Sequence, residues 1–165
     1  MKLLLTSGGV TNPSIHSALV QLLGKPIGDS DALCIPTAEY GHPMCTPASA
    51  WRFIAGRSPS PMCDLGWKSL GVLELTALPT IGAERWVPWI READVLLVDG
   101  GDATYLYHWM RESGLADLLP SLPDMLSSIS RLSRGSWQIR MDARGITRTS
   151  SIALRRPPRR SRRRP

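Results

Sequence analysis

The first 120 residues alternate short apolar runs with stretches in which apolar residues recur at helical spacing. Four runs have the length and composition of strands in a buried sheet: Met1–Thr6, Ala32–Pro36, Leu70–Leu78 and Asp94–Asp99. The last run is uninterrupted between its two aspartates, which is typical of a strand covered on both faces of a parallel sheet. We therefore expect four strands in this part of the chain.

Helices are predicted between these strands. Asn12 is a good N-cap, Pro13 fits the first helical position, and Gly24 ends the apolar periodicity that follows. Further helices are expected near 47–56, in a short stretch ending before Asp94, and over 103–119, where Gly114 weakens the helix. The side chains expected to face the core from these helices are Trp51, Phe53, Ile54, Trp86, Trp89, Ile90, Leu106, Met110 and Leu118.

The alternation of strands and helices predicts an α/β fold in which helices flank a parallel sheet. Ligands of such sheets bind outside the carboxyl ends of the strands, so the segments that follow the first, second and fourth strands are expected to meet at one rim. These segments are Ser7-Gly8-Gly9, Thr37–Pro43 and Gly100-Gly101-Asp102. Glycines let backbone N–H groups approach a ligand closely, and a helix N-terminus favours negative charge, which together suit an oxyanion or a phosphate. Backbone geometry at a strand-to-helix turn explains the glycine pair equally well.

Charge divides the chain into two segments near residue 125. Residues 1–130 hold eight Lys and Arg against thirteen Asp and Glu, whereas residues 131–165 hold twelve Arg against one acid, so the overall net charge of +6 averages −5 and +11. We predict a folded domain over 1–124 and a disordered Arg/Ser/Pro-rich tail over 125–165. The tail has the charge to bind nucleic acid or another polyanion through Arg155–Arg164, weakly and without sequence preference.

Other kinds of chemistry have little support in the sequence. There is no apolar stretch of membrane-spanning length, no signal-like N-terminus and no CxxC pair, so we expect a cytoplasmic protein without disulfide, metal or cofactor. Neither GxGxxG nor GxxxxGK[ST] occurs, which leaves dinucleotide and P-loop binding unsupported. His42 is the histidine expected at the rim, where it touches substrate or is simply solvated. Cys34 and Ser7 are alternative nucleophiles, but neither has a visible base.

Three segments resemble the peptidase E family, which comprises aspartyl dipeptidase and cyanophycinase-like serine peptidases. They are LLLTSGG at 3–9, the strand and loop Cys34–Ala38, and above all VLLVDGGDATYLYHWMRESGLADLL at 95–119. The resemblance covers about residues 1–122 and implies a three-layer glutamine-amidotransferase-like fold, of the broader flavodoxin-like kind, that acts on small or Asp-containing peptides. It also implies that the N–H of Gly101 or Gly100 belongs to an oxyanion hole, supported by Asp102 where the family usually has Asn.

The catalytic part of the family pattern is missing. In the family the next strand ends in a Gly-x-Ser-Ala-Gly nucleophile elbow, and a catalytic histidine follows; here 127–135 read SSISRLSRG, without a strand-like apolar run, and no histidine follows His108. Ser130 and Ser133 therefore lack a base. One of several codon choices for 131–135, CGG CTC AGC CGG GGN, reads Gly-Ser-Ala-Gly when shifted by one base. We hypothesise that the C-terminal part is truncated or out of frame, which would leave the sheet without its central strand, the preceding helices exposed and the domain marginally stable.

The sequence thus predicts a peptidase E-like serine hydrolase that has no activity, because the nucleophile elbow and the catalytic histidine are absent. The alternative is a non-catalytic α/β module whose Arg-rich tail binds nucleic acid or another polyanion. An active hydrolase built on Cys34 or Ser7 is a third hypothesis, which fast reaction of Cys34 with a thiol label would support.

Overall fold

The computed structural model describes residues 2–122, 124–129, 137–142 and 145–150. The chain forms two compact units, Met1–Arg134 and Gly135–Pro165. The first unit contains a sheet of five strands, all parallel, in the order β1-β5-β4-β2-β3. These strands are β1 (Lys2–Leu5), β2 (Asp31–Ile35), β3 (Ser69–Val72), β4 (Val95–Val98) and β5 (Leu126–Ile129).

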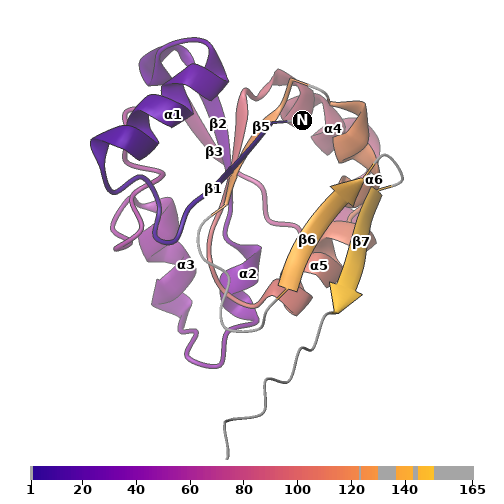
Figure 1. Ribbon diagram of the computed structural model, residues 1–165. Coiled ribbons are helices and arrows are strands. Elements are labelled where there is room, and N and C mark those ends of the chain that lie inside the picture. Colours follow the sequence, from indigo (N-terminus) through magenta and orange to yellow (C-terminus); the bar gives the residue numbers. More distant parts are fainter. Residues whose placement is uncertain (1, 123, 130–136, 143–144, 151–165) are drawn as a thin grey trace, which may run out of the picture. The chain divides into compact units, whose positions relative to one another are not determined.

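Helices cover both faces of this sheet, so the first unit is a three-layer α/β fold and the predicted fold class is confirmed (Figure 1). On one side lie α1 (Pro13–Leu23) and α3 (Pro47–Ile54), and on the other α4 (Ala83–Glu92), α5 (Ala103–Glu112) and α6 (Leu115–Leu118). The single turn α2 (Thr37–Tyr40) follows β2, and three 3-10 turns, η1 (Ile27–Asp29), η2 (Leu78–Thr80) and η3 (Leu119–Ser121), complete the connections.

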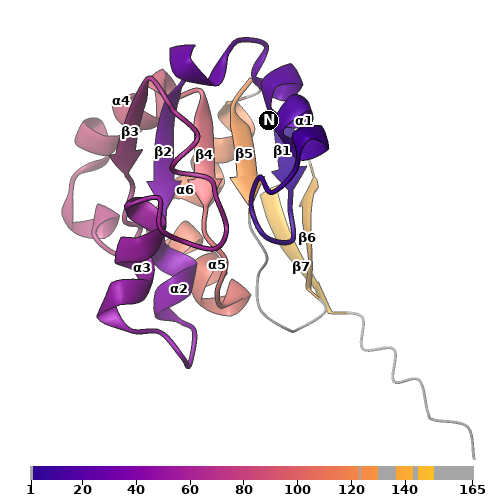
Figure 2. The same ribbon diagram turned by 90° about the vertical axis from the view of Figure 1, so that its left-hand side faces the viewer.

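The strand order is related to the flavodoxin-like order 2-1-3-4-5 but differs at one edge (Figure 2). The strands β3-β2-β4-β5 are arranged like the first four strands of the flavodoxin-like order, whereas the N-terminal strand β1 takes the fifth position. Backbone hydrogen bonds fix β1 there, because Lys2 N–H donates to the Met125 carbonyl (2.8 Å) and Thr6 N–H to the Ile129 carbonyl (3.0 Å). This edge of the sheet therefore pairs residues that are more than 120 positions apart in the sequence.

A strand follows α6 where the sequence predicted none: β5 lies second from one edge of the sheet. All four of its residues are buried, and it pairs with β1 on one side and β4 on the other. The sheet therefore continues past the predicted domain boundary at residue 124, and apolar side chains of the preceding helices, Trp86, Ile90 and Leu106, are buried. The prediction was wrong because Ser127 and Ser128 interrupt the apolar pattern, whereas the pairing of backbone groups along a strand does not depend on the side chains.

The second unit contains an antiparallel pair, β6 (Trp137–Asp142) with β7 (Gly145–Ser150). The sequence predicted disorder from 125 onwards, so these strands are a correction. Along 137–142 apolar residues alternate with polar ones in the two-residue period of a strand, a signal that the high arginine content of the segment concealed. Residues 151–165, including Arg155–Arg164, lie outside the described residues.

The predicted helix and strand ends agree with the structure where local chemistry defines them. The Asn12 side chain accepts a hydrogen bond from Ile15 N–H (2.9 Å), and Gly24 closes α1 with φ +76°. The predicted strand 70–78 is wrong in its second half, because Thr76 donates from both its N–H and its hydroxyl to the Glu74 carboxylate and the chain turns away from the sheet.

Two tryptophans expected in the core lie on the surface instead. Trp51 is 51% exposed and Trp89 55% exposed, while Phe53 and Ile90 are buried. In α4 the buried pair is Trp86 and Ile90, four residues apart, which leaves Trp89 at the edge of the apolar face. The Trp51 ring is covered by the Arg57 guanidinium, 5.1 Å from its centroid.

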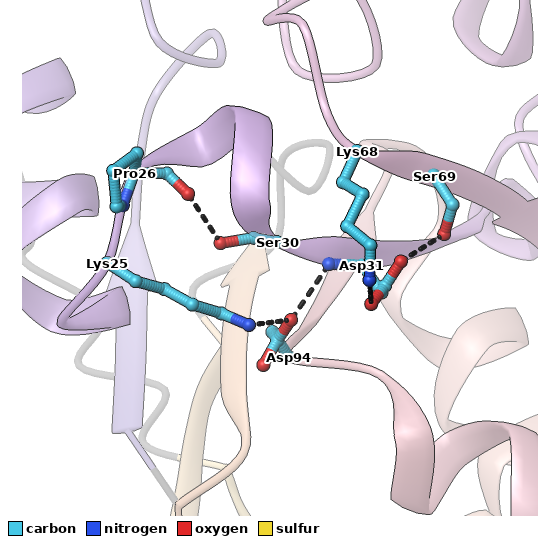
Figure 3. Close-up of polar contacts among 7 residues, drawn as sticks. All are labelled: Lys25, Pro26, Ser30, Asp31, Lys68, Ser69 and Asp94. Atoms are coloured by element: carbon cyan, nitrogen blue, oxygen red, sulfur yellow. Dashed lines mark hydrogen bonds and ion pairs between the residues drawn. The ribbon is translucent and has the colours of Figure 1, made fainter.

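Polar contacts join three strands at their amino ends (Figure 3). The Asp94 carboxylate accepts from Lys25 Nζ (2.7 Å) and from Asp31 N–H (2.8 Å). The Asp31 carboxylate in turn accepts from Ser69 Oγ (2.7 Å) and Lys68 Nζ (2.9 Å), which lowers the pKa of Asp31, the Ser69 bond most. These contacts fix the starts of β2, β3 and β4 and leave the opposite, carboxyl ends free to form a site.

Candidate functional site

A cleft of about 910 Å³ opens at the carboxyl ends of the strands. From β2 the chain continues to β3 at one edge of the sheet, whereas from β4 it continues to β5, in the opposite direction. The strand order therefore reverses between the neighbouring strands β2 and β4. In open α/β sheets the ligand site lies outside the carboxyl ends of the strands at such a reversal. The lining residues are Ser7, Glu39, His42, Pro43, Ser49, Arg52, Ser58, Pro59, Ser60, Asp99, Gly100, Gly101 and Asp102.

The structure brings all three of the predicted rim segments to this cleft. Ser7 comes from the segment after β1, His42 from the segment after β2, and Gly100-Gly101-Asp102 from the turn after β4. Gly8 and Gly9 are not among the lining residues. Gly9 has φ +76° and packs closely against the backbone of 60–61: a Cβ would come within 2.7 Å of the Pro61 carbonyl oxygen. Gly9 therefore allows two backbone segments to pack together and does not line the cleft.

Three groups of lining residues were not predicted. Arg52 and Ser49 come from α3, and Ser58–Ser60 from the loop that follows it, far in sequence from the strand ends. Asp99 was assigned to the end of its strand, whereas Glu39 lies within Thr37–Pro43, a segment that was predicted to reach the rim without Glu39 being singled out. The signal available for Glu39 and Asp99 was their position directly after parallel strands; nothing in the sequence places Arg52 at this rim.

The glycine turn after β4 is shaped by close contact with α2. Gly101 has φ +143°, and a Cβ at this position would collide with the Ala38 carbonyl group. Asp102 N–H donates to the Ala38 carbonyl (2.8 Å), and the Asp102 side chain caps α5 by accepting from Tyr105 N–H (2.7 Å). Backbone geometry therefore accounts for Gly101, and helix capping for Asp102.

The amide of Gly100 is directed to a protein carboxylate. Its N–H donates to Oδ1 of Asp99, the preceding residue, over 2.8 Å. An oxyanion would have to displace this carboxylate to use the same amide. The oxyanion hole that the resemblance implies is therefore not preformed at Gly100.

Asp99 is the most perturbed acid of the cleft. It is 7% exposed, and its burial raises the pKa of the carboxyl to about 7; the charge of Glu39 adds to the rise, and the hydrogen bond from Gly100 opposes it. Apart from that one bond, we find no hydrogen bond or ion pair of the Asp99 side chain within the described parts of the chain.

Two further charged side chains of the cleft, Glu39 and Arg52, have no partner within the described residues. In the described residues neither the Glu39 carboxylate nor the Arg52 guanidinium forms a hydrogen bond or an ion pair. His42 accepts at Nδ1 from Met44 N–H (3.1 Å) and has no serine partner there. The cleft thus presents charges of both signs that are available to a ligand.

None of the candidate nucleophiles among the described residues, Cys34 and Ser7, has a base. Cys34 is completely buried, and its neighbour Cys63 stays a thiol because their hydrogen bond and burial raise the pKa of Cys63. Ser7 lines the cleft without a hydrogen bond to a base. The predicted elbow position at 131–135, together with Ser130 and Ser133, lies outside the described residues.

Family models and curated proteins were compared with the chain. The chain matches none of the models of known protein families, and no curated protein is significantly similar to it.

In the described part of the chain, no three His, Cys, Asp or Glu side chains are placed to hold a metal ion. None of the helices described has the length and hydrophobicity of a membrane span.

Proposed function

We propose that the first unit is a peptidase E-like domain that binds small or Asp-containing peptides in the cleft and does not hydrolyse them. The observation that carries this proposal is the cleft, which lies where the strand order reverses. The segments predicted to meet at the rim, which follow β1, β2 and β4, all contribute to its lining. Its unpaired charges support a peptide ligand, because Arg52 offers a partner for a carboxylate and Glu39 one for an amine.

The lack of hydrolysis is proposed on chemical grounds. Acyl transfer by a serine needs a base within hydrogen-bond reach and donors for the oxyanion. Ser7 has no such base in the described residues, and the Gly100 amide already serves Asp99. Peptide binding without turnover is the function that these features favour.

The test is a binding titration of an Asp-containing dipeptide, with the release of free amino acids measured in the same samples. We expect saturable binding and no release above blank. Arg52→Gln should weaken binding by about tenfold, because a charge-assisted hydrogen bond is lost, while Arg85→Gln on the exposed surface of α4 should leave it unchanged. Release of amino acids that a Gly101→Pro change abolishes would overturn the claim of inactivity; absence of binding would overturn the proposal as a whole.

A second candidate function rests on the charge of the tail. Twelve arginines against one acid over 131–165 favour a chain that binds nucleic acid or another polyanion through Arg155–Arg164. Deletion after Ile152 should then abolish binding of a mixed-sequence oligonucleotide, and raising the salt should weaken it steeply. Binding that survives either change would contradict this candidate. For both candidates we propose a cytoplasmic location, which the three free cysteines favour.

A further inference from the structure

The Asp99 carboxyl lines the cleft in an environment that lacks a balancing charge. It is more than nine-tenths buried, and among the described residues only the Gly100 N–H is bound to it, at Oδ1. Removing a carboxylate from water without a cationic partner is costly, so a positive group that reaches it gains more than it would at the surface. No Lys, Arg or His of the described residues supplies that charge.

Glu39 makes the same region of the cleft more acidic. It comes from α2 and lines the cleft with Asp99, and its charge adds to the rise in the pKa of Asp99 that burial causes. Its own carboxylate has no partner within the described residues. The remaining charged or titratable lining groups are Asp102, which is held by the first turn of α5, and Arg52 and His42, neither of which pairs with these two acids.

We propose that Asp99 and Glu39 form a subsite for a protonated primary amine. An alkylammonium group brings one positive charge and three N–H donors, which relieves the repulsion between the two carboxylates and the desolvation of Asp99 together. A metal ion fits less well, because no third ligating side chain accompanies them in the described part of the chain. The Gly100 N–H holds Oδ1 in place, so the carboxylate is oriented before the amine arrives.

Two sources carry this chemistry, the amino terminus of a peptide and a free aliphatic diamine. The peptide source rests on the proposed function; the subsite itself does not. The experiment therefore titrates the full chain with three probes by calorimetry: a free dipeptide, the same dipeptide acetylated at its amino group, and 1,4-diaminobutane. Each probe is tested on the unaltered chain, on Asp99→Asn, on Glu39→Gln, and on Glu84→Gln, whose carboxylate lies on the surface of α4 and outside the cleft.

We expect the free dipeptide to bind about tenfold or more tightly than the acetylated one, because acetylation removes both the charge and two donors. Asp99→Asn keeps an oxygen for the Gly100 N–H but loses the charge, and should weaken the free dipeptide by about tenfold while leaving the acetylated one unchanged. Glu39→Gln should have a smaller effect in the same direction, since Glu39 is less buried, and Glu84→Gln should have none.

Equal affinity for the free and acetylated dipeptides would overturn the amine subsite and leave the proposed peptide binding intact. Binding of the diamine alone, lost in Asp99→Asn, would support the subsite and overturn the peptide proposal. Absence of binding by all three probes would overturn both. If Asp99→Asn does not fold, the acetylation comparison on the unaltered chain together with Glu39→Gln decides the question.

Discussion

Asp99 couples the cleft to the stability of the fold at the level of a single residue. The pKa of its carboxyl is about 7 in the folded chain, raised by burial from an ordinary value of 3.8. The folded protein therefore holds a proton that the unfolded chain has already lost between pH of about 4 and 7. Across that window the free energy of unfolding falls as pH rises, by at most about 1.4 kcal/mol per pH unit from this group.

An Asp99→Asn variant should remove this dependence. The amide does not ionise, and its oxygen still accepts from Gly100 N–H, so the variant should gain stability relative to the unaltered chain as pH rises from 4 to 7 and be the more stable protein at pH 8. Urea unfolding at pH 4.5, 6 and 8 measures the difference, with the exposed Asp29→Asn as a control. A stability difference that stays constant over this range would show that Asp99 does not titrate there.

The sequence could predict which residues meet at the rim but not what they do there. Ser7, His42 and Gly101 follow parallel strands, and the carboxyl ends of parallel strands meet by construction. The engagement of the Gly100 amide by Asp99 depends on a side-chain rotamer, and the approach of Gly101 to Ala38 depends on how α2 packs. Neither leaves a trace in residue spacing, so the predicted oxyanion role could not be checked without the structure.

Among the structural elements, the starts of β2 and β4 depend on one carboxylate. Asp94 accepts from the Asp31 amide and from Lys25, and its side chain is partly buried. Asp94→Ala should lower the free energy of unfolding by about 1–2 kcal/mol, because a backbone N–H loses a charged acceptor. Denaturant unfolding measures this loss, and Asp29→Ala, at an exposed aspartate of the neighbouring turn, should change stability much less. Equal effects of the two substitutions would mean that the Asp94 contacts add nothing.

The β5 strand contains a buried hydroxyl that should lower its stability. Ser128 is fully buried, and its Oγ has no hydrogen-bond partner within the described residues. Ser128→Ala should therefore raise the free energy of unfolding by about 1 kcal/mol. The matched control is Ser30→Ala, because Ser30 is equally buried but donates to the Pro26 carbonyl (2.9 Å), and its loss should destabilise the fold. Destabilisation by both substitutions would contradict this account of Ser128.

Elements with strong local signals were predicted well, and those that depend on tertiary contacts were not. The Asn12 cap with Gly24, and the apolar run of β4, identify their elements without reference to the rest of the chain. β5 was missed because the two serines at its centre give no apolar pattern, and the strand is defined by its backbone pairing with β1 and β4. Trp51 was misplaced because an eight-residue helix has too few turns to define which apolar residues form its buried face.

At the scale of the whole molecule, the first unit has a five-stranded parallel sheet in which β5 and its neighbour β1 have unusual features. The two middle residues of β5 are buried serines, and Leu5 of the neighbouring edge strand β1 is 67% exposed. The hypothesis that the chain leaves its reading frame near residue 125 rests on the charge break there and concerns the coding DNA. Sequencing the coding DNA over Leu119–Arg144 tests it: a single shifted base that restores Gly-Ser-Ala-Gly and an open frame would support the hypothesis, and its absence in both other frames would contradict it.

The central claim is that the cleft at the strand ends binds small peptides without cleaving them. Saturation-transfer NMR on an Asp-Leu dipeptide mixed with the full chain tests both parts in one sample, since magnetisation passes only to a bound peptide and free amino acids give their own signals. The account predicts transfer to the dipeptide, weaker transfer at the same peptide concentration in Arg52→Gln, and no amino acid signals after prolonged incubation. Spectra without transfer, or with growing signals of free Asp and Leu, would contradict it.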